Sequence, residues 1–396
     1  MLKFSWAARA LVLIAALPLA AIAAPASKVK VGFLTTLSGP QANLGQMHLD
    51  GFKLALEAAG NKLGGVPVEL VVADDKLDPE SGVESVRKFL DRDHVDFVTG
   101  VVFSNVLLAA YKPVVDSKTF FISSFSGPSP LSGDKCDPYF FSAGVQNDST
   151  YEAVGKYVND VAHVKRVFIL APNYQGGRDA VSGFKRYYKG SVVGEVYTRV
   201  GQPDYSAEIA QVRAAAPDAL YFFYPGSMGV TFVRQAAAAG LNLPMYSGFS
   251  IEESNVHAMG DAAAGRFTAA VYNDDLKNPQ NQAFANLYMA KFHRRPSIYA
   301  ALGFDAVKVL DLAVASVHGD LSKKDEIRMA LEKARFNLVR GPMQFNTNHF
   351  PIQNFYLAEA VKERGDMRLE YRGDIFTPHR DAYAAACKLA SKGIAK

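Results

Sequence analysis

Short apolar runs rich in Val, Ile and Phe alternate along the chain with longer segments in which apolar residues recur at helical spacing. The short runs predict buried strands, because branched and aromatic residues pack well on a pleated sheet. The predicted strands are Val29–Leu34, Val68–Ala73, Val95–Thr99, Thr119–Ser123, Arg166–Ala171, Val192–Tyr197, Ala219–Tyr224, Pro244–Ser247 and Gly265–Ala270. The predicted helices are Leu44–Ala59, Ser81–Asp91, Asn105–Asp116, Ser149–Ala162, Gly177–Lys189, Ser206–Ala216, Gly229–Ala239, Asn281–His293 and Ile298–His318. This alternation predicts βαβ units, parallel sheets and an α/β fold class.

The predicted strands fall into two sets, which favours two sheets over one. The first set ends near Ser142, and the second continues to about Ala270, where the polar stretch YNDDLKNPQNQ interrupts it. The later segment GPMQFNTNHFPIQNFYLAEAV predicts a hairpin rather than another βα unit. A chain of 396 residues is long enough for two domains of ~150 residues each.

The first residues have the pattern of a secretory signal peptide. Lys3 and Arg9 precede an uncharged apolar run from Ala10 to Ala24, and the small residues Ala21-Ile22-Ala23 offer a cleavage site. The run is shorter than the ~20 apolar residues of a membrane span. We therefore expect residues 1–24 to be removed and the mature protein to be exported.

Charge and cysteine content narrow the class of protein further. The formal net charge is +4, and Lys3 and Arg9 supply two of these charges, so the chain has no basic field for gathering nucleic acid. The two cysteines, Cys136 and Cys387, either form a disulfide in an oxidising compartment, which we favour, or remain two inert thiols.

The sequence contains none of the common catalytic motifs. GxSxG, HExxH and GxxxxGKS/T are absent, and no GxGxxG follows the first predicted strand. No cysteine or histidine spacing matches a zinc site. The acid pairs Asp74-Asp75 and Asp274-Asp275 could hold a cation, but helix capping and solvation are commoner uses of such residues. We therefore expect neither an enzyme nor a bound cofactor or metal.

Several predicted strand-to-helix corners carry small polar residues beside an aromatic residue. Free amides at the start of a helix attract an anion, and Ser or Thr hydroxyls add donors. Taken singly, each corner is equally well explained as a cap or a turn. Their repetition favours a shared cleft, since pockets are mostly apolar with a few placed polar groups. The corners are Thr36–Pro40, Phe103–Asn105, Ser124–Gly127, Asn173–Gly176, Phe223–Ser227 and Gly248–Ser250.

Four long stretches carry a resemblance to a known family. They are VGFLTTLSGPQANLGQMHLDGFKLALEAAG, VELVVADDKLDPESGVESVRKFL, FSAGVQNDSTYEAVGKYV and DYSAEIAQVRAAAPDALYFFYPGSMGVTFVRQAAAAGL. Together they resemble the type 1 periplasmic solute-binding proteins of ABC importers, the group that includes the leucine/isoleucine/valine-binding protein. The resemblance implies two Rossmann-like lobes with parallel sheets, joined by three crossovers, and a ligand cleft between the lobes.

The resemblance also implies where the lobes divide. The crossovers would fall near Gly144, Tyr272 and Pro342. The first lobe would then combine residues 28–143 with 273–341, and the second lobe 144–272 with 342–371, leaving a C-terminal tail of residues 372–396.

The family's ligand anchors carry over only in part. Relatives that bind amino acids hold the carboxylate with first-lobe hydroxyls and amides, and hold the ammonium with acidic side chains. The carboxylate anchors fall on Ser104, Ser126 and Gly127, but the acidic positions fall on Gln146 and on Gly248-Phe249. A buried ammonium without a carboxylate partner costs several kcal/mol. Asp148 lies nearby in the sequence and could substitute.

Carboxylate anchors and spare aromatic residues together favour an aromatic carboxylate, of the benzoate or hydroxycinnamate kind. The stretches FISSFSGPSPL and APNYQGG are similar to those of family members that serve aromatic-acid uptake. Arg178 either pairs with the carboxylate or is a solvated residue of the helix surface. The full set of predicted ligand-binding residues is Ser38, Phe103, Ser104, Asn105, Phe125, Ser126, Gly127, Gln146, Asp148, Tyr174, Arg178, Tyr224, Gly248 and Phe249.

The resemblance implies a periplasmic monomer that closes on its solute by a hinge motion and delivers it to an ABC permease in the inner membrane. Three alternatives stay open from the sequence. The solute could be a branched-chain or other amino acid, the protein could be a ligand-sensing receptor subunit of the same fold, or it could be a secreted enzyme that uses a pair of acids in the cleft.

Overall fold

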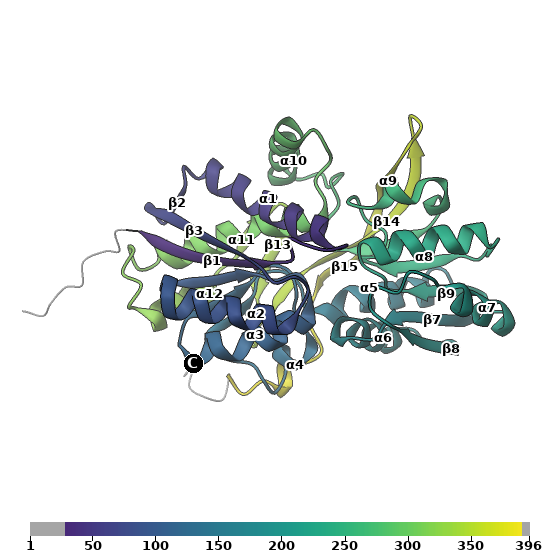
Figure 1. The fold of residues 1–396 in the computed structure, drawn as a ribbon, viewed down its shortest axis with the longest axis horizontal. Coiled ribbons are helices and arrows are strands. Elements are labelled where there is room, and N and C mark those ends of the chain that lie inside the picture. The colour runs from purple at the N-terminus through teal and green to yellow at the C-terminus, as the bar shows by residue number, and fades with distance from the viewer. Residues whose placement is uncertain (1–27, 390–396) are drawn as a thin grey trace, which may run out of the picture.

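The computed structural model describes residues 28–389, so the predicted signal peptide lies outside the described residues. Two lobes of strands and helices lie side by side along the long axis of the molecule (Figure 1). The predicted α/β class with two lobes of parallel sheet is confirmed. Across residues 28–389, no helix is both long and apolar enough to cross a membrane.

The first lobe is built on a six-stranded sheet. Its strands are β1 (Val29–Thr35), β2 (Lys62–Leu63), β3 (Val66–Asp74), β4 (Phe97–Gly100), β5 (Phe120–Ser123) and β6 (Phe140–Ser142). They are ordered β2-β3-β1-β4-β5-β6, and all pairs are parallel except β2 with β3. Parallel order places the carboxyl ends of β1, β4 and β5 at one edge of the sheet, where open α/β sheets bind ligands.

Helices cover this sheet and close the first core. They are α1 (Ala42–Ala58), α2 (Pro79–Lys88), the π-helix η1 (Phe89–Asp93), α3 (Ser104–Asp116), α4 (Ser129–Ser132), α10 (Pro279–Phe292), α11 (Ile298–Ala315) and α12 (Lys324–Lys333). Phe33 of β1, Phe52 of α1 and Leu310 of α11 belong to one buried cluster. At Gly51 a Cβ atom would lie 1.9 Å from the carbonyl oxygen of Ala300, so only glycine lets α1 approach α11 this closely.

The second sheet has nine strands; most of them lie in the second lobe, whereas residues 336–345 pack in the first lobe's core. Its strands are β7 (Arg166–Pro172), β8 (Ser191–Thr198), β9 (Ala219–Phe222), β10 (Met245–Gly248), β11 (Phe267–Ala270), β12 (Phe336–Leu338), β13 (Gly341–Phe345), β14 (Pro351–Glu363) and β15 (Asp366–His379). The strands β7 to β11 pair in parallel, whereas β12 to β15 are antiparallel, as the predicted hairpin requires. The helices and helical turns are α5 (Asn147–Asp160), α6 (Gln175–Tyr187), α7 (Ser206–Ala215), α8 (Ser227–Ala238), α9 (Val256–Met259), η2 (Gly260–Ala263) and η3 (Ala384–Ala386).

The chain passes between the lobes three times. The first passage joins β6 to α5, and the second joins β11 to α10. The third is β14 itself: Pro351 pairs with Phe345, whose side chain belongs to the first lobe's core, whereas Tyr356 pairs with Ala270 of β11. The passage predicted near Pro342 therefore falls later in the chain, because β13 still packs on the first lobe.

Arg340 ties these passages together at the hinge. Its guanidinium is 2% exposed and donates to the carbonyl oxygens of Ala143 and Gly144, the latter at 2.9 Å. Its Nε lies 3.5 Å from Oδ2 of Asp305, and the Tyr356 hydroxyl donates to the Arg340 carbonyl at 2.7 Å. Buried charges are retained when they are paired and hydrogen-bonded in this way.

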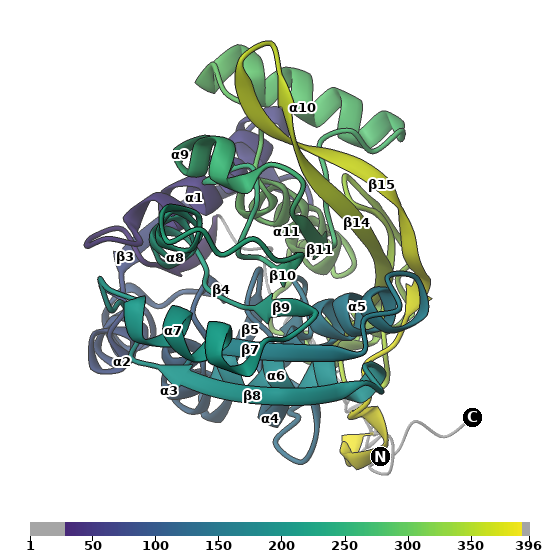
Figure 2. The same cartoon turned by 90° about the vertical axis from the view of Figure 1, so that its right-hand side faces the viewer.

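The C-terminal residues return to the first lobe. Strand β15 runs to His379, past the predicted start of the tail at residue 372, because it pairs with β14 along its length. Beyond it, Cys387 forms a disulfide with Cys136, with the two Cα atoms 5.7 Å apart. Of the two alternatives for the cysteines, the structure has the bonded one. Figure 2 shows the long β14–β15 hairpin at the side of the molecule, with the C-terminal segment near its base.

Candidate functional site

A narrow pocket lies between the two lobes, at the carboxyl ends of β4, β5, β9 and β10. Seven of its fourteen lining residues are aromatic, and none carries a charged side chain. The cavity measures about 30 Å³. This volume suits water-sized guests, so a ring-bearing guest requires some movement of the rings or lobes. The lining residues are Val102, Phe103, Ser104, Phe125, Ser126, Val145, Asn147, Tyr151, Tyr174, Gly176, Phe223, Pro225, Phe249 and Tyr299.

The aromatic rings of the pocket pack on one another from both lobes. Phe125 stacks on Tyr299, with ring centroids 4.5 Å apart and an interplanar angle of 7°. Phe249 of the second lobe lies 5.7 Å from Phe125 of the first. Tyr151 meets Phe223 edge to face at 5.1 Å. These walls are suited to a flat apolar guest, because aromatic pairs gain ~0.5–1.5 kcal/mol beyond burial.

A pair of serine hydroxyls forms the polar end of the pocket. The Oγ atoms of Ser104 and Ser126 lie 2.8 Å apart, and both residues are buried. Nδ2 of Asn147 donates to the Ser104 hydroxyl at 2.9 Å. The Ser126 backbone amide donates to the carbonyl of Val101 at 3.1 Å, which fixes the turn that carries it. The pocket therefore presents hydroxyl donors from the first lobe and an amide from the start of α5.

The helix that begins at Ser104 adds a positive end to the same place. The N-cap residue of α3 is Phe103, whose side chain makes no capping hydrogen bond. By contrast, Gln146 caps α5 by accepting a hydrogen bond from the Ser149 amide at 3.1 Å. The first amides of a helix have no intrahelical acceptor, so the start of α3 can bind an anion.

Two pocket-side residues have backbones in the left-handed region. Val101 has a φ of 65° and Phe249 a φ of 56°. Such conformations are rare for a β-branched or bulky residue and cost ~1–3 kcal/mol each. They turn the chain sharply at the ends of β4 and β10, which aims Phe103 and Phe249 into the cavity.

A buried histidine supports the first-lobe wall from behind. Nε2 of His48 lies 2.8 Å from the hydroxyl of Ser124, which accepts a hydrogen bond from the Gly100 amide at 3.1 Å. The His48 ring meets Phe125 edge to face at 6.0 Å. Burial lowers the pKa of His48 to about 3, so the ring is neutral at physiological pH. His48 therefore positions Phe125 without adding charge to the pocket.

Six of the predicted ligand-binding residues come together in this pocket: Phe103, Ser104, Phe125, Ser126, Tyr174 and Phe249. Three more adjoin it. The Gly127 amide donates to Oδ1 of Asn147 at 3.0 Å, Gln146 caps α5, and Gly248 lies against Tyr151, where an added Cβ would sit 3.0 Å from the ring.

Three predicted site residues belong elsewhere. Ser38 is exposed and its hydroxyl bonds to Asp74, so the first corner is a turn held by an acid. Arg178 is exposed and donates to Oδ1 of Asn173 at 2.9 Å, which leaves the surface alternative. Asn105 is half-buried and lies outside the pocket lining, since one residue along a helix turns a side chain by about 100°.

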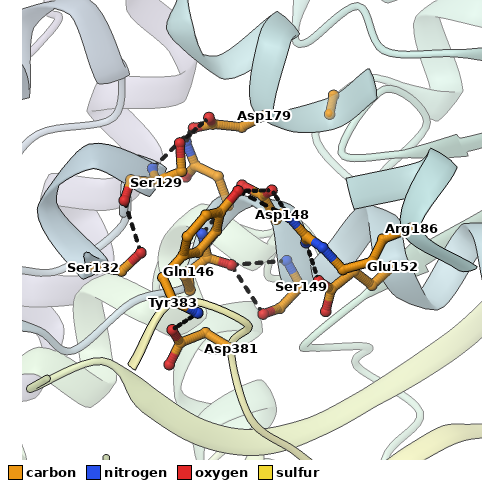
Figure 3. Close-up of polar contacts among 12 residues, drawn as sticks. Ser129, Ser132, Gln146, Asp148, Ser149, Glu152, Asp179, Arg186, Asp381 and Tyr383 are labelled. Atoms are coloured by element: carbon orange, nitrogen blue, oxygen red, sulfur yellow. Dashed lines mark hydrogen bonds and ion pairs between the residues drawn. The ribbon is translucent and has the colours of Figure 1, made fainter. Parts of the chain in front are cut away.

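Tyr224 and Asp148 also lie outside the pocket, contrary to the prediction. Tyr224 is buried in the second lobe's core, with its ring 5.2 Å from Phe232, and its neighbour Phe223 lines the pocket instead. Asp148 faces away from the pocket: its Oδ2 accepts from the Tyr383 hydroxyl at 2.7 Å and lies 3.2 Å from Nη2 of Arg186 (Figure 3). It is therefore not placed to hold a ligand's ammonium.

Eight lining residues are absent from the predicted ligand-binding set, and four of them bring an aromatic ring or an amide: Asn147, Tyr151, Phe223 and Tyr299. The helix begins at Asn147, two residues before its predicted start at Ser149, and this places Asn147 and Tyr151 four residues apart on one helix face. Phe223 is the neighbour of Tyr224, which is in the predicted ligand-binding set. Tyr299 had no comparable signal, because it reaches the pocket from α11, far along the chain.

Two buried acids outside the pocket lining have raised pKa values. Burial, together with the nearby Asp179, raises the pKa of Asp148 to about 7. Burial also raises the pKa of Glu252, which lines a separate small cavity, to about 8. Among the described residues, no group of three or more His, Cys, Asp or Glu side chains is arranged to hold a metal.

Comparison with known proteins identifies the class. Residues 28–366 match the family described as periplasmic binding protein, and the chain belongs to this family. It is an ABC-type periplasmic solute-binding protein, a class that binds small molecules and works with ABC permeases. The class implies a periplasmic location.

Individual relatives agree with this assignment. A solute-binding protein of an ABC transporter from R. palustris, solved in complex with benzoate, is 30% identical with a TM-score of 0.86, covering 91% of this chain and 99% of that one. A Leu/Ile/Val-binding protein of Rhizobium johnstonii is 25% identical over 78% of this chain and 84% of its own length. A leucine-, isoleucine-, valine-, threonine- and alanine-binding protein of Pseudomonas aeruginosa is 24% identical over 90% of this chain and 91% of its own length. These relatives are solute-binding proteins rather than enzymes.

Proposed function

We propose that the protein is the substrate-binding component of an ABC importer whose solute is a small aromatic carboxylate of the benzoate kind. The observation that carries this proposal is the composition of the interlobe pocket. Aromatic rings surround a single polar end, which consists of two serine hydroxyls and the uncapped start of α3. A flat ring with one carboxylate matches both parts.

The carboxylate would bind at the serine pair. Hydrogen bonds to a charged group are worth ~1.5–3 kcal/mol each, and a helix N-terminus favours negative charge. The pocket contains no Lys or Arg in its lining, so hydroxyls and backbone amides supply the stabilisation. Such donors are fixed in place before the ligand arrives, which limits the ordering cost of binding.

An amino acid fits the pocket less well. Its ammonium would need a carboxylate partner, and the lining offers none. Asp179, which lies behind Asn147, already accepts four hydrogen bonds from protein donors. A buried, unpaired ammonium costs several kcal/mol. The R. palustris protein solved with benzoate supports the same choice of solute.

Closure of the lobes would trap the solute and present the closed form to the permease. Contacts between the lobes flank the pocket and would accompany this closure. On one side, Gln41 of the first lobe accepts from the Ser227 amide at 3.3 Å and donates to the Pro225 carbonyl at 3.4 Å. Both partners lie at the start of α8 in the second lobe.

Calorimetry with matched ligands tests the proposed solute. Benzoate is expected to bind, benzamide to bind far more weakly because it keeps the ring without the charge, and leucine to give no heat. Phenylalanine keeps a ring and a carboxylate but adds an ammonium, so its weaker binding would isolate the cost of that group. Tight binding of leucine with no heat from benzoates or cinnamates would overturn the proposal.

A further inference from the structure

Asp179 is a buried acid of the second lobe that binds the first lobe. It lies in the first turns of α6 and is 2% exposed. Its Oδ1 accepts a hydrogen bond from the Ser129 hydroxyl at 2.7 Å, and its Oδ2 accepts from the Ser129 amide at 3.3 Å. Ser129 is the first residue of α4, and Figure 3 shows the two side chains directed toward each other. Asp179 therefore clasps the start of a helix in the opposite lobe.

The same carboxylate also holds a residue of the pocket. Nδ2 of Asn147 donates to Oδ2 of Asp179 at 2.8 Å and to Oγ of Ser104 at 2.9 Å. Oδ1 of Asn147 accepts from the Gly127 amide at 3.0 Å. With both N–H groups and the oxygen engaged, the orientation of this amide is determined by its partners.

The fixed amide decides how the serine pair can bind a guest. Because Asn147 donates to Ser104, the Ser104 oxygen acts as an acceptor. The two serine hydroxyls share one hydrogen bond at 2.8 Å, in which either oxygen can be the donor. In both arrangements one O–H hydrogen is left over and can point into the pocket. The polar end of the pocket is therefore a donor, as a carboxylate requires.

Two of the four donors to Asp179 come from its own lobe, and two come from the other. Gln175 and Asn147 donate to it within the second lobe, at 2.7 and 2.8 Å. The hydroxyl and amide of Ser129 reach it from the first lobe. Of the four hydrogen bonds to Asp179, separation of the lobes would break the two from Ser129. Hydrogen bonds to a charged group are stronger than those between neutral groups, and the Ser129 pair exists only when the lobes are together, so this clasp favours the closed arrangement.

We propose that Asp179 is a positioning residue that couples closure of the lobes to the polar end of the pocket, by clasping Ser129 and fixing the amide of Asn147 against Ser104. The role rests on the proposed function, because the hydroxyl that it orients is the one expected to meet the ligand's carboxylate. Asp179 itself lies outside the pocket lining and acts through Asn147.

The test compares D179N, S129A and their double variant with wild type and with the matched control S132A. The Ser132 hydroxyl donates to the Ser129 carbonyl at 2.9 Å within the first lobe and makes no contact with Asp179. Benzoate affinity is measured by calorimetry. Amide hydrogen exchange over residues 127–129 is followed with and without saturating benzoate, because it reports the Gly127 and Ser129 donors directly.

Loss of the charged hydrogen bonds should raise the Kd of D179N for benzoate roughly 10-fold or more. S129A should show a smaller loss, and the double variant should be no weaker than D179N, since the two residues form one unit. Exchange over residues 127–129 should be faster in D179N and unchanged in S132A.

Unchanged affinity and unchanged exchange in D179N would overturn the clasp, as would fully additive effects of D179N and S129A. If wild type binds no benzoate, the proposed solute fails. The clasp is then judged by exchange in the free protein alone, where faster exchange in D179N supports it and equal exchange overturns it. If D179N does not fold, S129A and S132A provide the same comparison.

Discussion

The two walls of the pocket differ in what they offer a guest. The first lobe contributes the hydroxyls of Ser104 and Ser126, together with the open start of α3. Both lobes contribute rings, Phe103, Phe125 and Tyr299 from the first and Tyr151, Tyr174, Phe223 and Phe249 from the second, but the serine hydroxyls come from the first lobe alone. Under the proposed function the first lobe would bind the charged end of a ligand, while rings of both lobes would enclose its apolar body.

The largest predicted effect comes from removing the polar wall. Ser104→Ala should raise the Kd for benzoate about 10- to 100-fold, since a hydrogen bond to a charged group is worth ~1.5–3 kcal/mol. The melting temperature of the free protein should change little. Ser38→Ala is the matched control, because Ser38 is exposed and lies outside the pocket. Equal affinities for the two variants, measured by calorimetry, would mean that the anchor lies elsewhere.

A second prediction concerns the proton held by Glu252, a buried acid of the second lobe. Burial raises the pKa of Glu252 from its ordinary 4.5 to about 8, with a smaller contribution from Glu253. Glu252 lies outside the pocket lining, and with this pKa its side chain is largely neutral at physiological pH. Because the folded protein holds this proton and the unfolded chain releases it, stability falls as pH rises from about 4.5 to 8.

In Glu252→Gln the side chain at this position cannot ionise, so the fall of stability with rising pH should be smaller than in wild type. We expect the unfolding free energy of the variant to exceed that of wild type by ~4 kcal/mol at pH 8 and by only ~1 kcal/mol at pH 5, because each pKa unit is worth ~1.4 kcal/mol. Some decline should persist, because burial also raises the pKa of Glu253 to about 7. Thermal melts at both pH values provide the measurement. If variant and wild type differ in stability by the same amount at pH 5 and at pH 8, the pKa of Glu252 is not raised.

Loss of one aromatic ring from the pocket should change the affinity for benzoate less than loss of the Ser104 hydroxyl. Phe223→Leu keeps the apolar volume but loses ring–ring contact, which is worth ~0.5–1.5 kcal/mol, so the Kd for benzoate should rise about 2- to 10-fold. Tyr224→Phe is the neighbouring control. Tyr224 is buried in the second lobe's core and lies outside the pocket lining, so removal of its hydroxyl should leave affinity unchanged. The reverse order of effects would restore the sequence prediction.

The smallest predicted effect concerns Arg178. Arg178→Ala should change benzoate affinity less than about twofold, since exposed substitutions usually stay within ±0.5 kcal/mol. Calorimetry against wild type gives the comparison. A loss of 10-fold or more would show that this exposed arginine reaches the ligand.

The sequence predicted those parts of the fold and site that depend on local pattern. Apolar runs and helical spacing indicated most of the strands and helices. The corners after β4 and β5 pointed to Ser104 and Ser126, which both line the interlobe pocket, because carboxyl ends of parallel strands share one edge. The choice between Phe223 and Tyr224 could not be read, since β9 is buried throughout and shows no alternation of apolar and polar residues.

Contacts between distant segments were beyond any local pattern. Asp179 and Ser129 meet only because the two lobes lie against each other, and His48 and Ser124 meet only because α1 packs on the first lobe's sheet. The neighbouring residues Asn147 and Asp148 show that the sequence does not indicate which of two adjacent polar side chains faces the pocket. One turns to the pocket and the other to Arg186, a difference set by the helix start at Asn147.

A crystal structure of the protein soaked with benzoate tests the central claim most directly. The account predicts a ring between Phe125, Phe223 and Phe249, with the carboxylate oxygens within hydrogen-bonding distance of the Ser104 or Ser126 hydroxyl and the first amides of α3. A carboxylate turned toward the second lobe, or benzoate bound outside the interlobe pocket, would contradict it.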